Sequence, residues 1–234
     1  MLHRKCTGLL LCAVTGLVAA TMSLPPAAGD PSRGRTKAAV RKSVEPGQID
    51  LERSRVYIYV DKTGLGHEHA IEGKIKSGEI QFGAKANAGL IEFDMTSFVA
   101  DSERSRKFVG LKGSTSASTQ QQVNTNMLGA DVLNTRRYPT ATFTIASAVL
   151  KKTTSGAASC ELKGDFALRG KARSLTLNAQ LLPSSGSRHL RGEFTILQTE
   201  YGITPYSTAL GAIGVADRLK IWGDIWIAGE DTVQ

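Results

Sequence analysis

The feature that most constrains the fold of this chain is an alternation of apolar and polar side chains that begins after Ile49 and recurs almost to the C-terminus. In its first occurrence, Val56, Ile58 and Val60 are separated by tyrosines. A period of two residues places apolar side chains on one face of a β-strand, whereas an amphipathic helix repeats every three to four residues. The sequence therefore predicts a series of strands that each bury one face.

The other segments with this pattern are separated by short connections rich in turn residues. The second is predicted to be a hairpin, because Ser77-Gly78 would form a tight turn between residues 68–76 and 79–82. The strands predicted after it cover residues 89–98, 140–150, 159–168, 174–182, 188–197 and 218–227. Together they predict an all-β, antiparallel fold of about eight strands, closed as a barrel or folded as a sandwich.

One long segment, residues 101–138, does not alternate. It is polar and rich in serine, threonine, glutamine and asparagine, and its centre, residues 119–133, is predicted to form a short helix ending near Asn134. An eight-stranded barrel can be filled by its own side chains or can hold one small ligand. Periodicity alone leaves both outcomes open.

The first 29 residues have the pattern of an export signal. Basic residues at positions 3–5 precede an apolar run over residues 7–20, and small residues near Ala20 and Ala28 offer cleavage sites. The apolar run is shorter than the roughly 20 residues that span a bilayer, so a retained anchor is the weaker alternative. We expect a periplasmic or secreted protein with no stable membrane span after signal removal.

The net charge of +8 is concentrated before the predicted domain. Residues 1–47 contain seven basic and two acidic side chains, which leaves 22 basic and 19 acidic for the rest of the chain. We therefore assign residues 30–48 to a basic flexible linker and residues 49–230 to one barrel domain. A surplus of +3 on that domain does not indicate nucleic-acid binding.

Cysteine is scarce in this chain. Cys6 and Cys12 lie within the predicted signal, so Cys160 is left alone and no intramolecular disulfide is expected. Cys160 shares strand parity with Leu162 and Phe166, which predicts a buried, unreactive thiol.

Three blocks of residues resemble the YceI-like family of exported bacterial lipid-binding proteins, in the same order and at compatible spacing. The first is an opening strand followed by a Leu-Gly turn and a second strand, the second contains a Tyr-Pro pair, and the third is a short Gly-Ile motif. In this sequence they are Ser54-Arg55-Val56 with Gly64-Leu65-Gly66 and Ile71-Glu72-Gly73-Lys74-Ile75, then Leu128 to Phe143 with Tyr138-Pro139, then Glu200-Tyr201-Gly202-Ile203. The resemblance implies a lipocalin-like barrel whose apolar interior takes the tail of a polyisoprenoid or fatty-acid-like lipid, with no catalytic activity.

The sequence departs from the family pattern in three places. Val132 and Leu133 stand where the family has aromatics, and residues 106–119 resemble an insertion in the long loop. His67-Glu68-His69 replaces residues that are usually small and polar.

The predicted ligand-binding residues are the inward-facing apolar side chains, a tyrosine near one mouth and two tryptophans of the last strand. Alternation gives that strand two apolar faces, so it does not settle which face the tryptophans occupy. The residues are Ile58, Ile71, Phe93, Phe143, Phe166, Leu177, Phe194, Tyr201, Trp222 and Trp226.

Two rival interpretations remain. His67 and His69 share one face of a strand, which suits bidentate metal binding in a periplasmic metal-binding or stress-response protein. His189 is the other histidine of the predicted domain, but its parity points it away from the interior. Alternatively, the insertion near residues 106–112 would contact a partner protein.

No catalytic motif is present, and neither an enzymatic activity nor a cofactor is predicted. The expected partner is a lipid, and the sequence leaves open whether the chain forms a homodimer.

Overall fold

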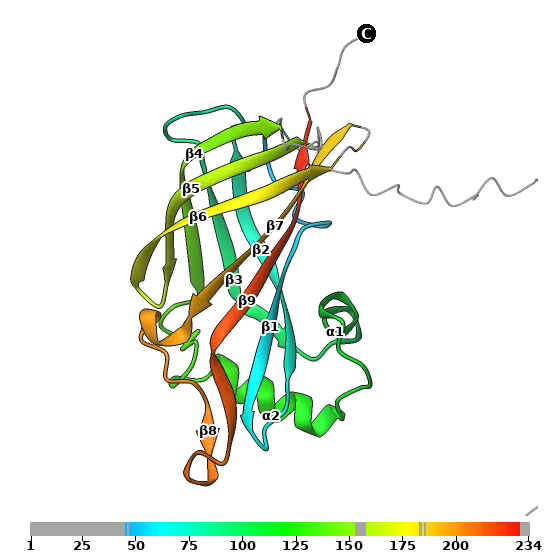
Figure 1. The fold of residues 1–234 in the computed structure, drawn as a ribbon, viewed down its shortest axis with the longest axis vertical. Helices are drawn as coiled ribbons and strands as arrows, with labels where there is room; N and C mark the ends of the chain where they lie inside the picture. The colour runs from blue at the N-terminus through cyan, green and yellow to red at the C-terminus, as the bar shows by residue number, and fades with distance from the viewer. Residues whose placement is uncertain (1–44, 46, 153–157, 183, 185, 230–234) are drawn as a thin grey trace, which may run out of the picture. The chain divides into compact units, whose positions relative to one another are not determined.

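The computed structural model describes residues 45, 47–152, 158–182, 184 and 186–229. Eight antiparallel strands form a closed barrel, because each strand pairs with the next and β1 pairs with β9 (Figure 1). The barrel strands are β1 (Arg55–Gly64), β2 (His69–Ile80), β3 (Gly89–Ala100), β4 (Thr140–Lys152), β5 (Ala158–Leu168), β6 (Lys171–Leu182), β7 (Ser187–Leu197) and β9 (Ile213–Ala228). The predicted antiparallel barrel is confirmed, and the sandwich is excluded.

The short elements between β7 and β9 add a small ribbon outside the ring of eight. η1 (Gln198–Tyr201) follows β7 directly, and β8 (Ser207–Thr208) and η2 (Ala209–Gly211) precede β9. β8 pairs only with the first residues of β9, at Ile213 and Gly214. The same part of β9 pairs with the end of β1.

The inner face of the barrel follows the alternation in the sequence. Ile58 of β1 lies opposite Ile71 of β2 and Ile221 of β9, so three branched side chains meet where the sheet closes. Val56 and Val60, two positions away on either side, are buried. The period of two therefore predicted the core correctly along this strand.

The predicted turn at Ser77-Gly78 was wrong, because β2 runs through it without interruption. A bulge at Lys76 shifts the register by one residue between Ile75 and Ser77. Position 78 favours glycine because the Cβ of any other residue there would lie 2.7 Å from Cδ1 of Ile49. The glycine admits a packed side chain from outside the strand instead of reversing the chain.

Two helices lie between β3 and β4. α1 (Glu103–Val109) is capped by the Ser102 side chain, and α2 (Ala117–Leu128) by Ser116. The predicted helix corresponds to α2, which starts two residues earlier and ends at Leu128, with Gly129 as its C-cap, before the expected Asn134. α1 was not predicted. Over the described ranges, neither helix nor any other is long and apolar enough to cross a bilayer.

The end of the barrel away from the helices is closed. Ile80, Ile145, Cys160 and Ile227 are each almost fully buried there. Residues 47–49 contribute to this end, since Gln48 bridges to Glu79 and Ile49 to Ile227. The boundary between the linker and the barrel domain stays a prediction. The predicted signal peptide and most of that linker lie outside the described residues.

Candidate functional site

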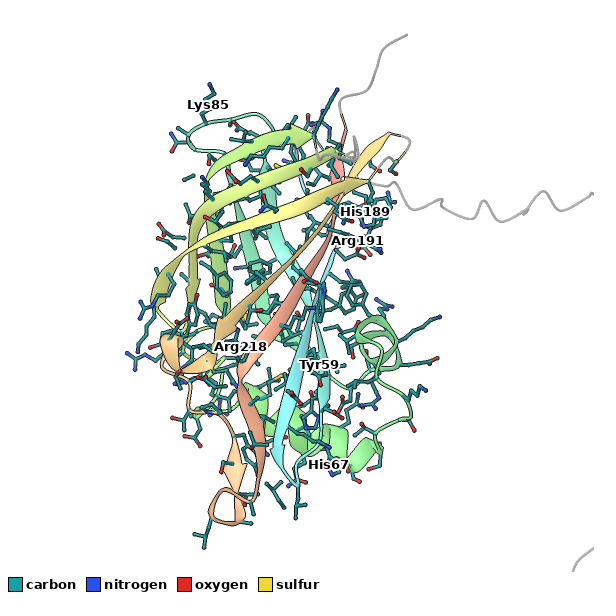
Figure 2. The ribbon with its side chains drawn as sticks, in the orientation of Figure 1. Tyr59, His67, Lys85, His189, Arg191 and Arg218 are labelled. Atoms are coloured by element: carbon teal, nitrogen blue, oxygen red, sulfur yellow. The ribbon has the colours of Figure 1, made fainter. Side chains whose placement is uncertain are left out.

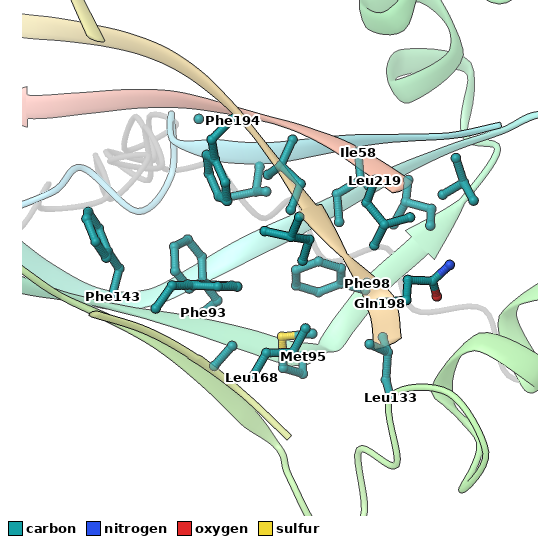
Figure 3. A pocket seen from close by; sticks show the side chains of 18 of the residues that line it. Ile58, Phe93, Met95, Phe98, Leu133, Phe143, Leu168, Phe194, Gln198 and Leu219 are labelled. Atoms are coloured by element: carbon teal, nitrogen blue, oxygen red, sulfur yellow. The ribbon is translucent and has the colours of Figure 1, made fainter. Parts of the chain in front are cut away.

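The barrel interior contains a cavity of about 220 Å³. One water molecule needs only about 10–15 Å³ measured in this way, so the core is not simply filled by side chains. The cavity is lined almost entirely by aliphatic and aromatic residues from all eight barrel strands and from α2 (Figure 3). Such a lining favours an apolar ligand.

The cavity exists because a row of neighbouring positions carries small residues. Ala179 of β6 lies opposite Gly192 of β7, and Gly192 lies opposite Gly223 of β9. All three line the cavity. Larger residues at these inward positions would occupy its volume.

Seven of the ten predicted ligand-binding residues line the cavity, and their role in binding stays a prediction. They come from seven different strands, and each was predicted from inward parity alone. These residues are Ile58, Ile71, Phe93, Phe143, Phe166, Leu177 and Phe194.

Phe166 is the centre of an aromatic group in the cavity wall. Its ring makes edge-to-face contacts with Phe93 at 6.1 Å and with Phe194 at 5.9 Å between centroids. Tyr201 contacts Phe166 in the same way, at 5.7 Å, but it does not line the cavity. Burial, followed by the nearby Glu200 carboxylate, raises the pKa of Tyr201 above its ordinary value. Tyr201 therefore supports the wall from behind.

The mouth of the cavity lies at the end covered by α2. Val123, Asn126 and Met127 of this helix line it, together with the Val132-Leu133 pair that departs from the family pattern. Gln198 and Leu133 lie together at this end, and Phe143 lies toward the opposite end (Figure 3). Tyr206, which is 40% exposed, also belongs to the lining.

α2 is fixed over the mouth by polar contacts with the end of β3. The amide of Ala100 donates to Oδ1 of Asn124 at 2.7 Å, and Nε2 of Gln120 donates to the Ala100 carbonyl at 2.8 Å. The helix carries no charged residue. Its apolar side chains can therefore face the cavity while its polar ones secure the helix.

Phe98 lines the cavity near its mouth, although the alternation of the sequence did not place it on the inner face. The register between β2 and β3 jumps between Glu72 and Lys74, so residues 95–98 bulge from β3 and Phe98 turns inward. The ring occupies the space above Gly73, where a Cβ would lie 2.3 Å from it. The Asp94 side chain, which accepts from the Thr96 amide at 3.0 Å, stabilises the bulge.

The two tryptophans, whose face the sequence left open, do not line the cavity although they were included among the predicted ligand-binding residues. Trp222 packs edge-to-face against Phe108 of α1, and its Nε1 donates to Glu193 at 2.8 Å. Trp226 stacks on His189, which lies on the outside of the barrel near Arg191 (Figure 2). Both indoles lie on the outer face because α1 and the segment before β1 cover that part of the sheet.

The two histidines proposed as a metal pair do not act together. His67 is exposed at the helix-covered end of the barrel (Figure 2). His69 lines the cavity, and its Nδ1 lies 2.8 Å from Oδ2 of Asp101. In the part of the chain that the structure describes, no group of three or more histidine, cysteine or carboxylate side chains is placed to hold a metal ion.

Asp101 connects His69 to α1. Its Oδ1 accepts from the Ala70 amide at 3.0 Å and from Arg106 at 3.1 Å. Burial alone would raise the pKa of Asp101, but the hydrogen bonds from His69 and Ala70 and the charges of His69 and Arg106 hold it below its ordinary value. The sequence contained the two histidines, but no signal that paired one of them with Asp101.

Cys160 is fully buried, as the sequence predicted. It does not line the cavity. Burial, with a smaller contribution from the Glu161 carboxylate, raises the pKa of its thiol to about 11.

The model of the YceI-like domain matches residues 48–225, almost the whole barrel. The chain belongs to the YceI-like family. A search of curated proteins found no match.

Two solved structures of this fold resemble the chain. BcnA of Burkholderia cenocepacia is 18% identical, with a TM-score of 0.52 over 77% of this chain and 99% of that one. A polyisoprenoid-binding domain from Saccharophagus degradans, described as implicated in plant cell wall breakdown, is 11% identical, with a TM-score of 0.54 over 79% and 99%. At these identities the likeness shows the fold alone.

Proposed function

We propose that this protein is an exported, non-catalytic carrier that holds a long-chain amphiphile, a polyisoprenoid or a fatty-acid-like lipid, in its barrel. The observation that carries the proposal is the apolar cavity of about 220 Å³ with its mouth beneath α2. Each CH₂ group moved from water into such a cavity contributes about 0.8 kcal/mol, so a hydrocarbon tail supplies most of the affinity. The family, and the polyisoprenoid-binding domain of the same fold, support a lipid as the ligand class.

The ligand is tested by extracting the protein, purified from its native host, with organic solvent and analysing the extract by mass spectrometry. We expect a reproducible long-chain lipid in near-stoichiometric amount. Absence of lipid, together with no binding of added isoprenoid or fatty acid, would contradict the carrier function.

A cavity-filling variant makes this test specific. A Cβ at Gly223 meets no atom closer than 3.4 Å, so Gly223→Leu places its side chain in the cavity without a backbone clash. We expect the folded variant to lose the lipid. Thr195→Leu adds the same side chain to an exposed position of β7, between two lining residues, and should retain it.

Export is proposed from the first 29 residues, whose basic start and apolar run have the pattern of a signal peptide. The N-terminus of the mature protein, determined by mass spectrometry on the periplasmic and medium fractions, tests this. We expect cleavage after Ala20 or near Ala28. An intact N-terminus in the cytoplasm would contradict export.

A further inference from the structure

The end of the barrel that carries the cavity mouth also carries the two most exposed large apolar side chains of the described residues. Leu210 is fully exposed, and Leu65 is 79% exposed. Leu65 belongs to the turn after β1, and Leu210 lies in η2, between β8 and β9. Figure 1 shows both segments at the end of the barrel where α2 lies.

The two segments are joined into one tip by backbone contacts. The amide of Leu65 donates to the carbonyl of Ala212 at 2.9 Å. A Cβ at Gly64 would collide with the same carbonyl, so the two backbones approach as closely as glycine allows. We call residues 63–66 and 207–214 the mouth tip. Because its two leucines share one projection of the molecule, they are not scattered surface residues of the ordinary kind.

The mouth tip is suited to an environment without water. Residues 202–216 include no charged side chain, although 21% of the chain is charged, and α2 at the same end carries none either. The tip also satisfies backbone donors internally: the amide of Gly66 donates to Thr63 at 3.0 Å, and that of Ala212 to Ala209 at 3.1 Å. Entry into a lipid phase would therefore strip water from neither a charge nor these amides.

The exposed leucine is held outward by an unfavourable backbone conformation. Ala209 has a φ of 50° and Leu210 a φ of 57°, both in the left-handed region that residues with a Cβ adopt at a cost. Asparagine and glycine tolerate this region better than leucine does. In water, a strained and fully exposed leucine contributes nothing to the fold, so its side chain is explained better by a contact outside the protein.

The ribbon that carries Leu210 leads directly to the cavity. Tyr206 and Val215 both line the cavity, and the Val215 amide donates to the Tyr206 carbonyl at 3.0 Å. Ile213, two residues before Val215 on the same face of β9, is 38% exposed and pairs with Thr208 of β8. An apolar surface thus continues from the cavity lining to the mouth tip.

We propose that the mouth tip docks the protein on a lipid bilayer by inserting Leu65 and Leu210 among the lipids, with the cavity mouth facing the membrane. The use of this docking to load a long-chain ligand rests on the proposed carrier function, whereas the docking itself does not. A stable protein–protein interface takes about 20–30 residues on each side. The tip offers only a few apolar side chains, which is too little for such an interface but enough for reversible insertion into a bilayer.

The test is flotation of the full-length mature protein with vesicles of neutral phosphatidylcholine at high salt concentration. Neutral lipid and salt are chosen because the basic segment before the barrel would attract anionic lipid whatever the tip does. We expect the wild type to bind these vesicles, Leu210→Asn to bind about tenfold more weakly, and Leu65→Gln with Leu210→Asn about a hundredfold more weakly. Absence of wild-type binding, or unchanged binding by the double variant, would overturn the proposal.

The matched control is Leu150→Asn. Leu150 is 49% exposed and pairs with Cys160 in the closed end of the barrel, away from the mouth tip. This variant should bind vesicles like the wild type, and an equal loss in both asparagine variants would overturn the assignment to the tip. Leu210→Asn should be at least as stable as the wild type in urea, because asparagine accepts the left-handed conformation. Its weaker vesicle binding therefore does not arise from unfolding.

Two further outcomes separate this proposal from others. Analytical ultracentrifugation should find a monomer, and a dimer that Leu210→Asn dissociates would overturn membrane docking in favour of self-association. A lipid in the solvent extract of a protein that does not bind vesicles would overturn the docking and leave the carrier function intact. Vesicle binding by a protein that yields no lipid and takes up none would support the docking and contradict the carrier function.

Discussion

The indole of Trp226 stacks on the imidazole of His189, with ring centroids 3.9 Å apart and 8° between the ring planes. The guanidinium of Arg53 lies 3.5 Å from the centroid of the same indole, and His189 Nε2 lies 2.7 Å from a carboxylate oxygen of Asp224. This outer cluster joins β7, β9 and the segment before β1 next to the closed end of the barrel. It stabilises the wall from outside and leaves the cavity to aliphatic and phenyl side chains.

Trp226→Ala should therefore reduce stability without changing ligand binding. Loss of the stacked ring and of the cation–π contact is expected to lower the free energy of unfolding by about 2–3 kcal/mol. Urea unfolding measures this loss, and lipid titration of the folded variant should give the wild-type affinity. A folded Trp226→Ala protein with markedly weaker lipid binding would contradict the outer placement of the indole.

A second prediction concerns Gly73 and Phe98, which meet across the bulge in β3. A Cβ at Gly73 would lie 2.3 Å from the Phe98 ring, so Gly73→Ala must displace that ring. We expect the substitution to cost about 1–3 kcal/mol by overpacking. Phe98→Leu in the same chain should recover part of the loss, because the smaller side chain leaves room for the methyl group. A double-mutant cycle from urea unfolding measures the coupling, and purely additive effects would contradict the contact.

The alternation in the sequence was sufficient to predict the antiparallel strands and most of the side chains that face the barrel interior. It placed Ile58, Phe143 and Phe194 inward because the ladder is regular at these positions and one face of each strand must be buried. The YceI-like motifs then removed the choice between barrel and sandwich.

The errors arose where the ladder is irregular or where both faces of a strand are covered. The bulge before Phe98 turns its side chain inward, where the alternation had placed it on the outer face. No local residue pattern predicts this bulge. Trp222 lies on a second apolar face, which exists only because α1 places Phe108 against it. The Asp101 and His69 pair joins residues 32 positions apart through tertiary structure, so spacing could not reveal it.

A third prediction follows from the lowered pKa of Asp101. A carboxyl group whose pKa is lower in the folded state contributes stability above its ordinary value of 3.8, and this contribution is lost as the pH falls through the folded value. Asp101→Asn removes the contribution. We expect the variant to be less stable than the wild type at pH 7, and the difference to shrink as the pH falls below the ordinary carboxyl range.

Urea unfolding at several pH values measures this difference. Glu193→Gln is the matched control, because this carboxylate is exposed on the outer face and its side chain bonds to Trp222. A deficit of Asp101→Asn that stays constant down to strongly acidic pH would contradict the assignment.

The last prediction concerns the thiol of Cys160, whose pKa burial raises to about 11 from an ordinary value of 9.0. Alkylation requires the thiolate, so iodoacetamide at pH 8 should leave the native protein unmodified and label it rapidly in urea, as mass spectrometry can show.

The raised pKa of Cys160 also affects the stability of the fold. Between pH 9 and 11 the unfolded chain loses the thiol proton and the folded chain keeps it. The contribution of the buried thiol to the free energy of unfolding is therefore complete below about pH 9 and declines above it. Cys160→Ala lacks this decline, and its stability relative to the wild type should rise across that interval. Rapid labelling of the native thiol at pH 8 would contradict its burial in the closed end of the barrel.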